Sequence, residues 1–384
     1  MKILITDPHL DGGGQVRYIA NLGRELVGQG HGVTVGCRPG SVLVAKATEA
    51  GCHVLDEFPF GGGLRFGAWR RDLRVLREFI RRESPDIVHV NLSQDHWSCA
   101  VGNRLQSFPV CLVRTRHNTY AVKETLANRV LNRRWTDYQI VVCDVVRREL
   151  AGQRTFDAQR MCSIHNGVDA EAFAPDAEGR ESARREFGFD ESDLVLGIAA
   201  RLVPAKGHEY LFRAVAELRA AIPNLKVLVL GQGELQEELV KLVTELSLDS
   251  QVLFAGYRED MPRCTQAFDI GVQPSVDCDT SSFSLKEQMA AEKAVIASDY
   301  GGLTEIVRDG TEGRIVPAGI VEPLADAIRK TVENPSLRAE MGKAGRRRVL
   351  DEFTVEVFAK RTVEAYRTAI EIHRQRREGN AQSP

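Results

Sequence analysis

The sequence predicts an α/β protein built from two doubly wound parallel sheets. Three observations favour this fold class. The 384 residues exceed what one hydrophobic core usually holds, so two domains are expected. Short apolar runs alternate with amphipathic stretches, which is the pattern of repeated β-α-β units. The alternation stops in a polar stretch at residues 171–192 and then begins again.

The first sheet is expected within residues 1–170. Its strand candidates are nearly continuous hydrophobic runs, as expected where helices cover both faces of a sheet. They are Lys2–Thr6, Gly32–Cys37, Ile87–Val90, Val110–Arg114 and Gln139–Cys143. The helix candidates between them are Gln15–Val27, Ala68–Arg82, Trp97–Leu105 and Asp144–Ala151.

The second sheet is expected within residues 171–353. Its strand candidates are Leu194–Ala199, Lys226–Leu230, Val252–Ala255, Asp269–Gln273 and Ala294–Ser298. Its helix candidates are His208–Ala221, Leu235–Leu246 and Leu285–Ala291. Residues 354–384 form a last segment, in which an amphipathic helix over 354–376 precedes a polar tail from Gln375 that we expect to be frayed.

The composition is that of an ordinary globular protein, with 43% hydrophobic and 27% charged residues. A formal net charge of −2 gives no indication of nucleic acid as a partner. No apolar stretch reaches the roughly 18 residues that span a bilayer. The eight cysteines form no C-x-x-C pair and several lie in apolar runs, which indicates small buried side chains in a reducing compartment. A cytoplasmic protein is therefore expected.

Three glycines, Gly12, Gly13 and Gly14, follow the first strand and precede a helix. Their backbone N–H groups would be able to approach a ligand at the positive end of that helix. A tight β-α turn without a ligand explains these glycines equally well. A dehydrogenase is disfavoured, because the third glycine of the dinucleotide-binding fingerprint is missing.

Two cations, Arg201 and Lys206, lie in a loop directly after the strand Leu194–Ala199. Ligands of doubly wound sheets bind outside the carboxyl ends of the strands. At such a position the pair is able to hold a diphosphate, the arginine through its planar fork and the lysine as a point charge. Two solvated loop cations are an equally good interpretation of the spacing alone.

The segment from Asp279 to Glu287 combines two carboxylates, several hydroxyl residues and the expected start of a helix near Ser284. A helix start offers free N–H groups to an anion. Ser284-Leu-Lys-Glu287 also fits the S-x-x-E capping box, in which the glutamate only satisfies a backbone N–H. Taken by itself, the segment favours this capping role for Glu287.

The order of these motifs resembles glycosyltransferase family 4, the retaining enzymes of the GT-B fold, in which two Rossmann-like domains face a cleft. The glycine turn, the R-x4-K loop and the acid-x7-Glu element carry the resemblance. Gly301–Gly310, the turn His165–Asp169 and Gly231-Gln-Gly233 support it. The resemblance covers nearly the whole chain, and it implies that the final helix crosses back to the first domain.

The resemblance also implies a role for each motif. Arg201 and Lys206 would hold the donor diphosphate and neutralise the leaving group. Asp279 and His117 would lie near the donor sugar and would be catalytic residues together with the two cations. Glu287 would bind the ribose hydroxyls. The remaining nucleotide- or substrate-binding residues would be Gly12, Gly13, Gly14, Gly231, Gly256, Ser282, Phe283, Ser284 and Leu285.

The implied activity is the transfer of a hexose-type sugar from a UDP- or GDP-sugar to a glycan or glycolipid, such as lipopolysaccharide or another cell-surface polysaccharide. No His, Asp and Cys cluster with ligand spacing is visible, so neither a metal nor a cofactor is expected. Two alternatives stay open. One is a nucleotide-sugar epimerase or hydrolase of the same fold, and the other is a nucleotide-sugar-binding protein without turnover.

The chain departs from the family pattern at three positions. Asp279 stands where glutamate is usual, which shortens the reach of the carboxylate and is expected to change sugar preference. Phe283 lies four residues after this acid instead of two, so a different loop path is expected. Glu292 replaces a glycine that would relieve left-handed strain at a helix end, so we expect this helix to end differently.

Residues 64–82 include seven arginines, and Trp69, Leu73, Leu76 and Ile80 form one apolar helical stripe. The simpler interpretation is an amphipathic helix that packs on the first sheet and exposes a basic face. The same basic face would also attract anionic lipid, at about 1 kcal/mol for each basic residue. A membrane-associated acceptor and a peripheral location on the inner membrane face are therefore additional hypotheses.

Overall fold

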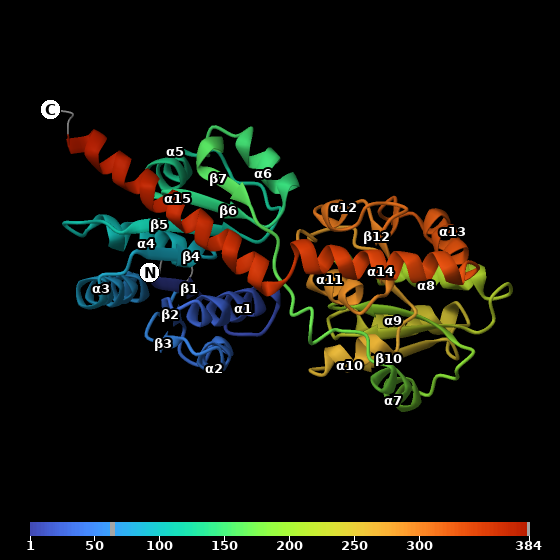
Figure 1. The fold of residues 1–384 in the computed structure, drawn as a ribbon. Coiled ribbons are helices and arrows are strands. Elements are labelled where there is room, and N and C mark those ends of the chain that lie inside the picture. Colours follow the sequence, from blue (N-terminus) through green and yellow to red (C-terminus); the bar gives the residue numbers. More distant parts are fainter. Residues whose placement is uncertain (62–65, 382–384) are drawn as a thin grey trace. The chain divides into compact units, whose positions relative to one another are not determined.

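Two parallel sheets, each in its own unit of the chain, form the framework of the computed structural model (Figure 1), which describes residues 1–61 and 66–381. Unit 1 contains residues 1–167 together with the C-terminal segment from Val355, and unit 2 contains Val168–Thr354. The two units are described separately.

Unit 1 carries a seven-stranded sheet within the described ranges, with strand order β3-β2-β1-β4-β5-β6-β7. Its strands are β1 (Lys2–Asp7), β2 (Gly32–Cys37), β3 (His53–Leu55), β4 (Ile87–Val90), β5 (Cys111–Arg116), β6 (Tyr138–Val141) and β7 (Met161–Ser163). Its helices are α1 (Gly14–Gly28), α2 (Leu43–Glu49), α3 (Phe66–Glu83), α4 (Ser93–Arg104), α5 (Leu126–Arg129), the π-helix η1 (Val130–Trp135), α6 (Asp144–Ala151), the 3-10 turn η2 (Ala158–Arg160) and α15 (Val355–Ala381).

The sheet of unit 1 is doubly wound, because the chain proceeds to β2 and β3 on one side of β1 and to β4 and its successors on the other. Every neighbouring pair is parallel. The order reverses between β1 and β4, which is where doubly wound sheets bind ligands. Helices α3 and α4 cover one face, and α15 packs on α1, β5 and β6.

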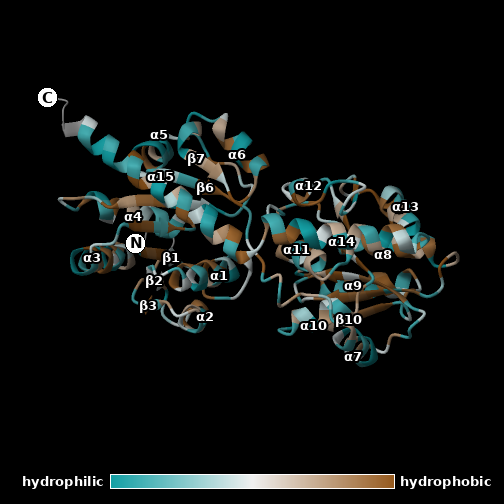
Figure 2. Cartoon of the chain, in the orientation of Figure 1, coloured by the Kyte–Doolittle hydropathy of each residue, from teal (hydrophilic) through white to brown (hydrophobic). Residues whose placement is uncertain are grey.

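Helix α3 buries Val75, Leu76, Phe79 and Ile80 in the core that includes strand β4. The expected stripe is therefore partly right, since Leu76 and Ile80 are buried while Trp69 is 37% exposed. The arginines of the described part of this helix lie mostly on its solvent side, which appears teal in Figure 2. Leu64 and Arg65, the first residues of the basic segment, lie outside the described residues.

Unit 2 carries a six-stranded parallel sheet within the described ranges, with strand order β10-β9-β8-β11-β12-β13. Its strands are β8 (Leu194–Ala199), β9 (Leu225–Leu230), β10 (Val252–Gly256), β11 (Ile270–Gln273), β12 (Ala294–Ser298) and β13 (Gly313–Val316). Its helices are α7 (Ala177–Phe187), the 3-10 turn η3 (Pro204–Lys206), α8 (His208–Leu218), α9 (Gln236–Glu245), α10 (Met261–Gln266), α11 (Phe283–Ala290), α12 (Leu303–Ile306), α13 (Val321–Val332) and α14 (Pro335–Glu352).

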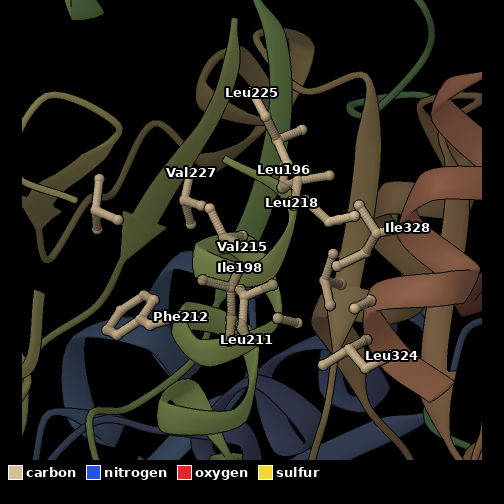
Figure 3. Packing of buried hydrophobic residues seen from close by; sticks show 14 of the residues in the cluster. Leu196, Ile198, Leu211, Phe212, Val215, Leu218, Leu225, Val227, Leu324 and Ile328 are labelled. Carbon is tan, nitrogen blue, oxygen red and sulfur yellow. The ribbon is translucent and has the colours of Figure 1, made fainter. Parts of the chain in front are cut away.

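Alternate side chains of the central strands of unit 2 enter two different cores. On β8, Leu196 and Ile198 pack against α8 and α13, as Figure 3 shows with Leu211 and Ile328. Val195, on the opposite face, packs with residues of α7 and α10. This two-sided burial explains why the strands are continuously hydrophobic in sequence. The order reverses between β8 and β11, which defines the expected ligand edge of this sheet.

Helix α15 continues to Ala381, so the expectation of a frayed tail from Gln375 was wrong for residues up to 381. Two side chains near the end of the helix fix it to Asp137, the residue before strand β6. Arg376 donates to Asp137 at 2.7 Å, and His373 lies 2.9 Å from the other oxygen of the same carboxylate.

The eight cysteines are free and most are buried, as expected. None of the helices in the described part of the chain has the length and apolar content of a membrane span.

Candidate active site

The loop after strand β8 places Arg201 and Lys206 at the carboxyl edge of the second sheet, beside the point where the strand order reverses. Pro204 begins the short turn η3, in which its missing N–H costs nothing, and Lys206 ends that turn. Gly207 follows with φ of +68°, a left-handed conformation that favours glycine. The turn therefore holds Lys206 at a fixed place at the edge of the sheet.

The loops after β8 and β11 pack on each other through their backbones. A Cβ on Gly207 would lie 2.0 Å from the carbonyl oxygen of Pro274. In addition, the N–H of Val276 donates to the carbonyl of Ala205 at 2.9 Å. Only glycine permits this approach, so the sequence Lys206-Gly207 brings the lysine next to the loop that carries Asp279.

Lys206 and Asp279, which are 73 residues apart in sequence, form an ion pair with 2.9 Å between Nζ and Oδ2. Gln273 Nε2 and Ser275 Oγ donate to the same oxygen at 2.9 and 2.7 Å. Asp279 is only 4% exposed, so these donors replace most of its hydration. The carboxylate is thereby held in one orientation toward the lysine.

Arg201 differs from Lys206 because its side chain is exposed and has no hydrogen-bond or ion-pair partner among residues 1–61 and 66–381. The two expected cations therefore lie in one loop, but only one of them is paired with an acidic side chain. Lys206 is neutralised inside the protein, whereas the Arg201 guanidinium is available to an anion at the surface of the loop.

Helix α11 begins two residues earlier than the capping-box interpretation requires. Its N-cap is Ser282, whose Oγ accepts a hydrogen bond from the N–H of Leu285. Ser284 therefore lies inside the first turn, and Glu287 is not at the capping-box position. The capping-box interpretation was wrong. Glu287 lies on the second turn and is 2% exposed.

Phe283, Ser284 and Leu285 form the first turn of α11, directly after the loop that carries Asp279. Ser282 already satisfies the N–H of Leu285. The N–H groups of Phe283 and Ser284 also belong to the first helical turn. They stand at the positive end of the helix.

Two further expected glycines, Gly231 and Gly256, lie together at the carboxyl ends of β9 and β10. The N–H of Gly231 donates to the carbonyl of Gly256 at 2.8 Å. A Cβ on Gly231 would lie 2.0 Å from the carbonyl oxygen of Ala200. Similarly, a Cβ on Gly301 would lie 2.2 Å from the carbonyl oxygen of Asp279. Glycines thus let the loops of this edge contact one another closely.

The expected residues of unit 1 lie at the carboxyl edge of its own sheet. Gly12 and Gly13 are in the loop after β1, and Gly14 is the first residue of α1. A Cβ on Gly12 or Gly13 would have no heavy atom of the described chain within 4 Å. The turn therefore does not need these two glycines for packing.

His117 follows strand β5 and is held on two sides. Its Nε2 lies 2.9 Å from Oδ1 of Asn91, an oxygen that only accepts, so Nε2 carries the proton. The ring of Tyr18, on α1, meets the imidazole edge to face at 4.6 Å. Burial, with nearby positive charge, lowers the pKa of His117 to about 3, so the ring is neutral at physiological pH.

Helix α11 ends as if Glu292 were a glycine. Glu292 adopts φ of +57°, and the N–H of Lys293 donates to the carbonyl of Gln288 at 3.0 Å. The expectation that this helix ends differently was therefore wrong. The glutamate accepts the left-handed strain that glycine would relieve.

One group of possible metal ligands occurs within the described residues, at Cys111, Asp137 and His373. Hydrogen bonds already occupy two of its members, Asp137 and His373. Both ring nitrogens of His373 have partners, at Asp137 and the carbonyl of Pro109. Asp137 also accepts from Arg376 and from the N–H of Leu112. A cation beside the carboxylate disfavours a metal there, and the group anchors α15.

Sequence reasoning missed the residues that hold the expected ones in place. Gln273, Ser275 and Asn91 orient Asp279 and His117, as the hydrogen bonds above show. A polar residue at the last position of an otherwise apolar strand is the signal that would have pointed to Gln273.

Comparison with known proteins agrees with this arrangement. Residues 12–172 match the model of Glycosyltransferase Family 4, and residues 179–348 match that of Glycosyl transferases group 1. A D-inositol 3-phosphate glycosyltransferase of Nocardioides sp. is 28% identical over 94% of this chain and 86% of its own length. A GDP-mannose-dependent monoacylated α-(1-6)-phosphatidylinositol monomannoside mannosyltransferase of Corynebacterium glutamicum is 30% identical over 52% of this chain and 54% of its own.

The solved structure of Anabaena HepE in complex with UDP superposes with a TM-score of 0.84, at 21% identity, over 96% of this chain and 100% of that one. This likeness concerns the fold, which is the GT-B architecture of two Rossmann-like domains. The two matched models between them account for most of the sequence. The chain belongs to glycosyltransferase family 4, group 1.

Proposed function

We propose that this protein is a retaining, metal-independent hexosyltransferase that moves a sugar from a UDP- or GDP-sugar to a glycan or glycolipid. The observation that carries the proposal is the Lys206–Asp279 ion pair, with the exposed Arg201 in the same loop as the lysine, at the edge of the second sheet where its strand order reverses. A diphosphate there would meet two cations, and a sugar attached to it would meet a carboxylate.

In the proposed reaction, the bond between the anomeric carbon and the diphosphate oxygen breaks, and its electrons stay with the diphosphate. The acceptor hydroxyl forms the new bond to the anomeric carbon and passes its proton to the oxygen of the departing diphosphate. Arg201 and Lys206 stabilise the negative charge that develops on the leaving group. The N–H groups of Phe283 and Ser284, at the start of α11, would supply further positive potential.

The carboxylates have separate proposed roles. Asp279, released from Lys206 when the diphosphate binds that lysine, would accept hydrogen bonds from hydroxyls of the donor sugar. Glu287 would accept hydrogen bonds from the ribose hydroxyls. His117, which is neutral, would meet the donor sugar without adding charge. The backbone of Gly12 and Gly13 would contact substrate in unit 1.

Relatives support the donor and acceptor classes. One matched relative is named for GDP-mannose and a phosphatidylinositol glycolipid, and the structure of HepE holds UDP. Either nucleotide fits the proposal. Exposed Phe66 and Trp69 at the start of α3, next to its arginines, support a peripheral membrane location, because aromatic and basic side chains favour the lipid interface. Lipopolysaccharide or another cell-surface polysaccharide would be the product.

A thermal-shift panel of UDP-, GDP- and ADP-sugars tests donor binding, since a ligand of the native state raises its apparent stability. Product analysis with the bound donor, with and without acceptor lipid extract, then separates the activities. Sugar release or epimerisation at the full rate without acceptor would indicate the hydrolase or epimerase instead. Binding without any product would indicate a non-catalytic protein. Unchanged turnover in EDTA is expected, and its loss would contradict metal independence.

Sedimentation with anionic and neutral vesicles tests the membrane location. Co-sedimentation with anionic vesicles at low salt is expected, and a charge-reduced R70S/R71S/R74S variant should lose it. These three arginines are exposed, so the substitutions should leave the fold intact. Equal binding by the variant, or none by the unmodified protein, would remove this part of the proposal.

A further inference from the structure

Strand β5 of unit 1 buries two arginines at its carboxyl end. Arg114 is 6% and Arg116 is 7% exposed. They are two residues apart, so both side chains leave the same face of the strand. Thr115, between them, faces the other way, where its Oγ1 lies 3.0 Å from the hydroxyl of Tyr18. The arginines therefore point away from α1, toward α4 and the segment that follows His117.

Neither arginine has an acidic partner within salt-bridge distance in the part of the chain that the structure describes. Arg114 donates to Nδ1 of His96 and, at 3.4 Å, to Ser93 Oγ. Arg116 donates to the carbonyl of Tyr120 at 3.2 Å and lies over the ring of Phe156. The Nε of each arginine is buried without a hydrogen-bond partner. Each guanidinium is therefore only partly satisfied.

The neighbouring titratable groups do not neutralise this charge. His96 accepts from Arg114 through Nδ1, and its Nε2 lies 2.7 Å from the hydroxyl of Thr136. Burial and the two arginines lower its pKa well below the usual range, so His96 stays neutral. Asp95 directs both of its oxygens to Thr6 and to N–H groups at the start of α4. Glu149 attracts Arg116 only from a distance.

Burial lowers the pKa of Arg114 to about 9 and that of Arg116 to about 10, so both remain cations at neutral pH. Buried charges in proteins are normally paired. Arg184 of unit 2, which is also 6% exposed, follows that rule, since it lies 3.3 Å from Asp269. Two unpaired cations on one strand are an exception that a bound anion would explain.

The two side chains line a pocket of about 210 Å³ that also includes Trp97, Asn118, Lys123 and Asn132. Its volume is about seven times the share of one water molecule in the liquid, which is room for a phosphate group. The pocket opens at the end of β5, the strand that leads directly into His117. An anion in it would lie beside the expected sugar site of unit 1.

We propose that this pocket binds a phosphate ester, and that this phosphate belongs to the acceptor. The guanidinium forks and the side-chain amides supply the donors that phosphate oxygens accept. Its role in selecting the acceptor rests on the proposed transferase function, whereas phosphate binding itself does not. The same chemistry fits a soluble sugar phosphate and a phospholipid headgroup, and the experiment distinguishes them.

Isothermal titration with inorganic phosphate tests the site in the full chain carrying Lys206→Ala, which removes a phosphate-binding cation from unit 2. Binding should persist in that background, and adding Arg116→Met should weaken it at least tenfold. Arg129→Met is the matched control, because Arg129 is exposed on the neighbouring helix α5 and should have no effect. Equal phosphate affinity with and without Arg116→Met would overturn the proposal.

The stability of the Arg116→Met variant is a second test, because a purely structural role of Arg116 predicts the opposite change in stability. Without phosphate, Arg116→Met should unfold at the same denaturant concentration as the unmodified protein or a higher one, because it removes an unpaired buried charge. A clear loss of stability in both Arg116→Met and Arg114→Gln would assign the arginines to the fold and overturn the proposal.

Glycerol 3-phosphate and vesicles containing phosphatidylinositol then identify the source of the phosphate. Binding of the soluble ester alone assigns a free sugar phosphate, and Arg116-dependent binding of the vesicles assigns a lipid headgroup. Failure of both, with inorganic phosphate also inactive, overturns the site. Donor nucleotide should still raise the melting temperature of Arg116→Met. A failure of the proposed phosphate pocket can therefore be distinguished from a failure of the proposed donor site.

Discussion

The ammonium group of Lys206 lies 2.9 Å from Oδ2 of Asp279, and the same oxygen accepts hydrogen bonds from Gln273 and Ser275. The lysine is therefore paired inside the protein, although a diphosphate would be a better partner for it. A donor that carries two phosphates would replace this pair and leave the carboxylate to the sugar. The pair thus links recognition of the diphosphate to recognition of the sugar.

Replacing Lys206 by alanine should lower kcat by about 10²–10³, the usual cost of removing one group that stabilises a developing anion. Turnover is measured with saturating donor and acceptor. Lys241→Ala is the control, because Lys241 is an exposed lysine on α9 of the same unit. If Lys206→Ala keeps more than half of the turnover, the lysine does not act on the leaving group.

The same substitution should also destabilise unit 2, by about 1–3 kcal/mol, because it leaves a buried carboxylate without its counter-charge. The double variant K206A/D279N should recover most of that stability, since an asparagine oxygen still accepts from Gln273 and Ser275. It should not recover turnover. Urea denaturation of the single and double variants checks this separation, and parallel losses of stability and activity in both would contradict it.

Gly207→Ala should destabilise unit 2 by about 2–5 kcal/mol, because it combines left-handed strain with a steric clash. Its new Cβ would lie 2.0 Å from the carbonyl oxygen of Pro274. Gly310→Ala measures the cost of the left-handed conformation without a clash. Gly310 has φ of +75°, but an added Cβ would meet no atom within 4 Å among the described residues. Gly310→Ala should therefore cost only about 1 kcal/mol. Equal losses of unfolding free energy in the two variants would show that the loops can move apart.

The sequence allowed the central strands to be predicted because both their faces are buried. Gly32–Cys37, Leu194–Ala199 and Ala294–Ser298 have the same bounds in the structure. The edge strands β3 and β7 were missed, since three residues are too short for any periodicity. Helix α7 was missed for a different reason, because it buries Arg184 through ion pairing and so has a polar sequence.

For the candidate site, the sequence located the cations but not their relationships. The rule that ligands bind at the carboxyl ends of strands placed Arg201 and Lys206 correctly at the edge of a sheet. Nothing in the spacing shows that Lys206 contacts a residue 73 positions away. The start of α11 was misjudged, because Ser282 and Ser284 are both good N-caps and only the backbone geometry distinguishes them.

Glu292→Gly should stabilise unit 2 by about 0.5–1 kcal/mol, because glycine adopts φ of +57° without the strain that a Cβ causes. Glu292 is exposed, so little packing is lost. Glu333→Gly, at the end of α13 with φ of −68°, is the control and should destabilise, because glycine there adds freedom to the unfolded chain and the exposed ion pair with Arg329 is lost. Chemical denaturation compares the two, and destabilisation by Glu292→Gly would mean that its side chain has a role of its own.

Unit 1 should lose stability as the pH falls below about 6.5. Burial lowers the pKa of His89 and of His117 to about 3, and that of His96 well below its usual value. Unfolding returns each to about 6.5, so the unfolded chain binds up to three more protons between these values. Asp95 acts in the opposite sense, because burial raises its pKa to about 7 and the folded state then holds its proton.

The balance is a net uptake of about two protons on unfolding near pH 5.5, and each net proton removes about 1.4 kcal/mol of stability per pH unit. Urea denaturation at pH 7.5, 6.5 and 5.5 should therefore show a steepening loss. His89→Gln should reduce the slope by about one proton, since a glutamine at the place where His89 meets Tyr366 and Thr115 does not titrate. A slope that stays the same in this variant would mean that His89 is not the group that takes up the proton.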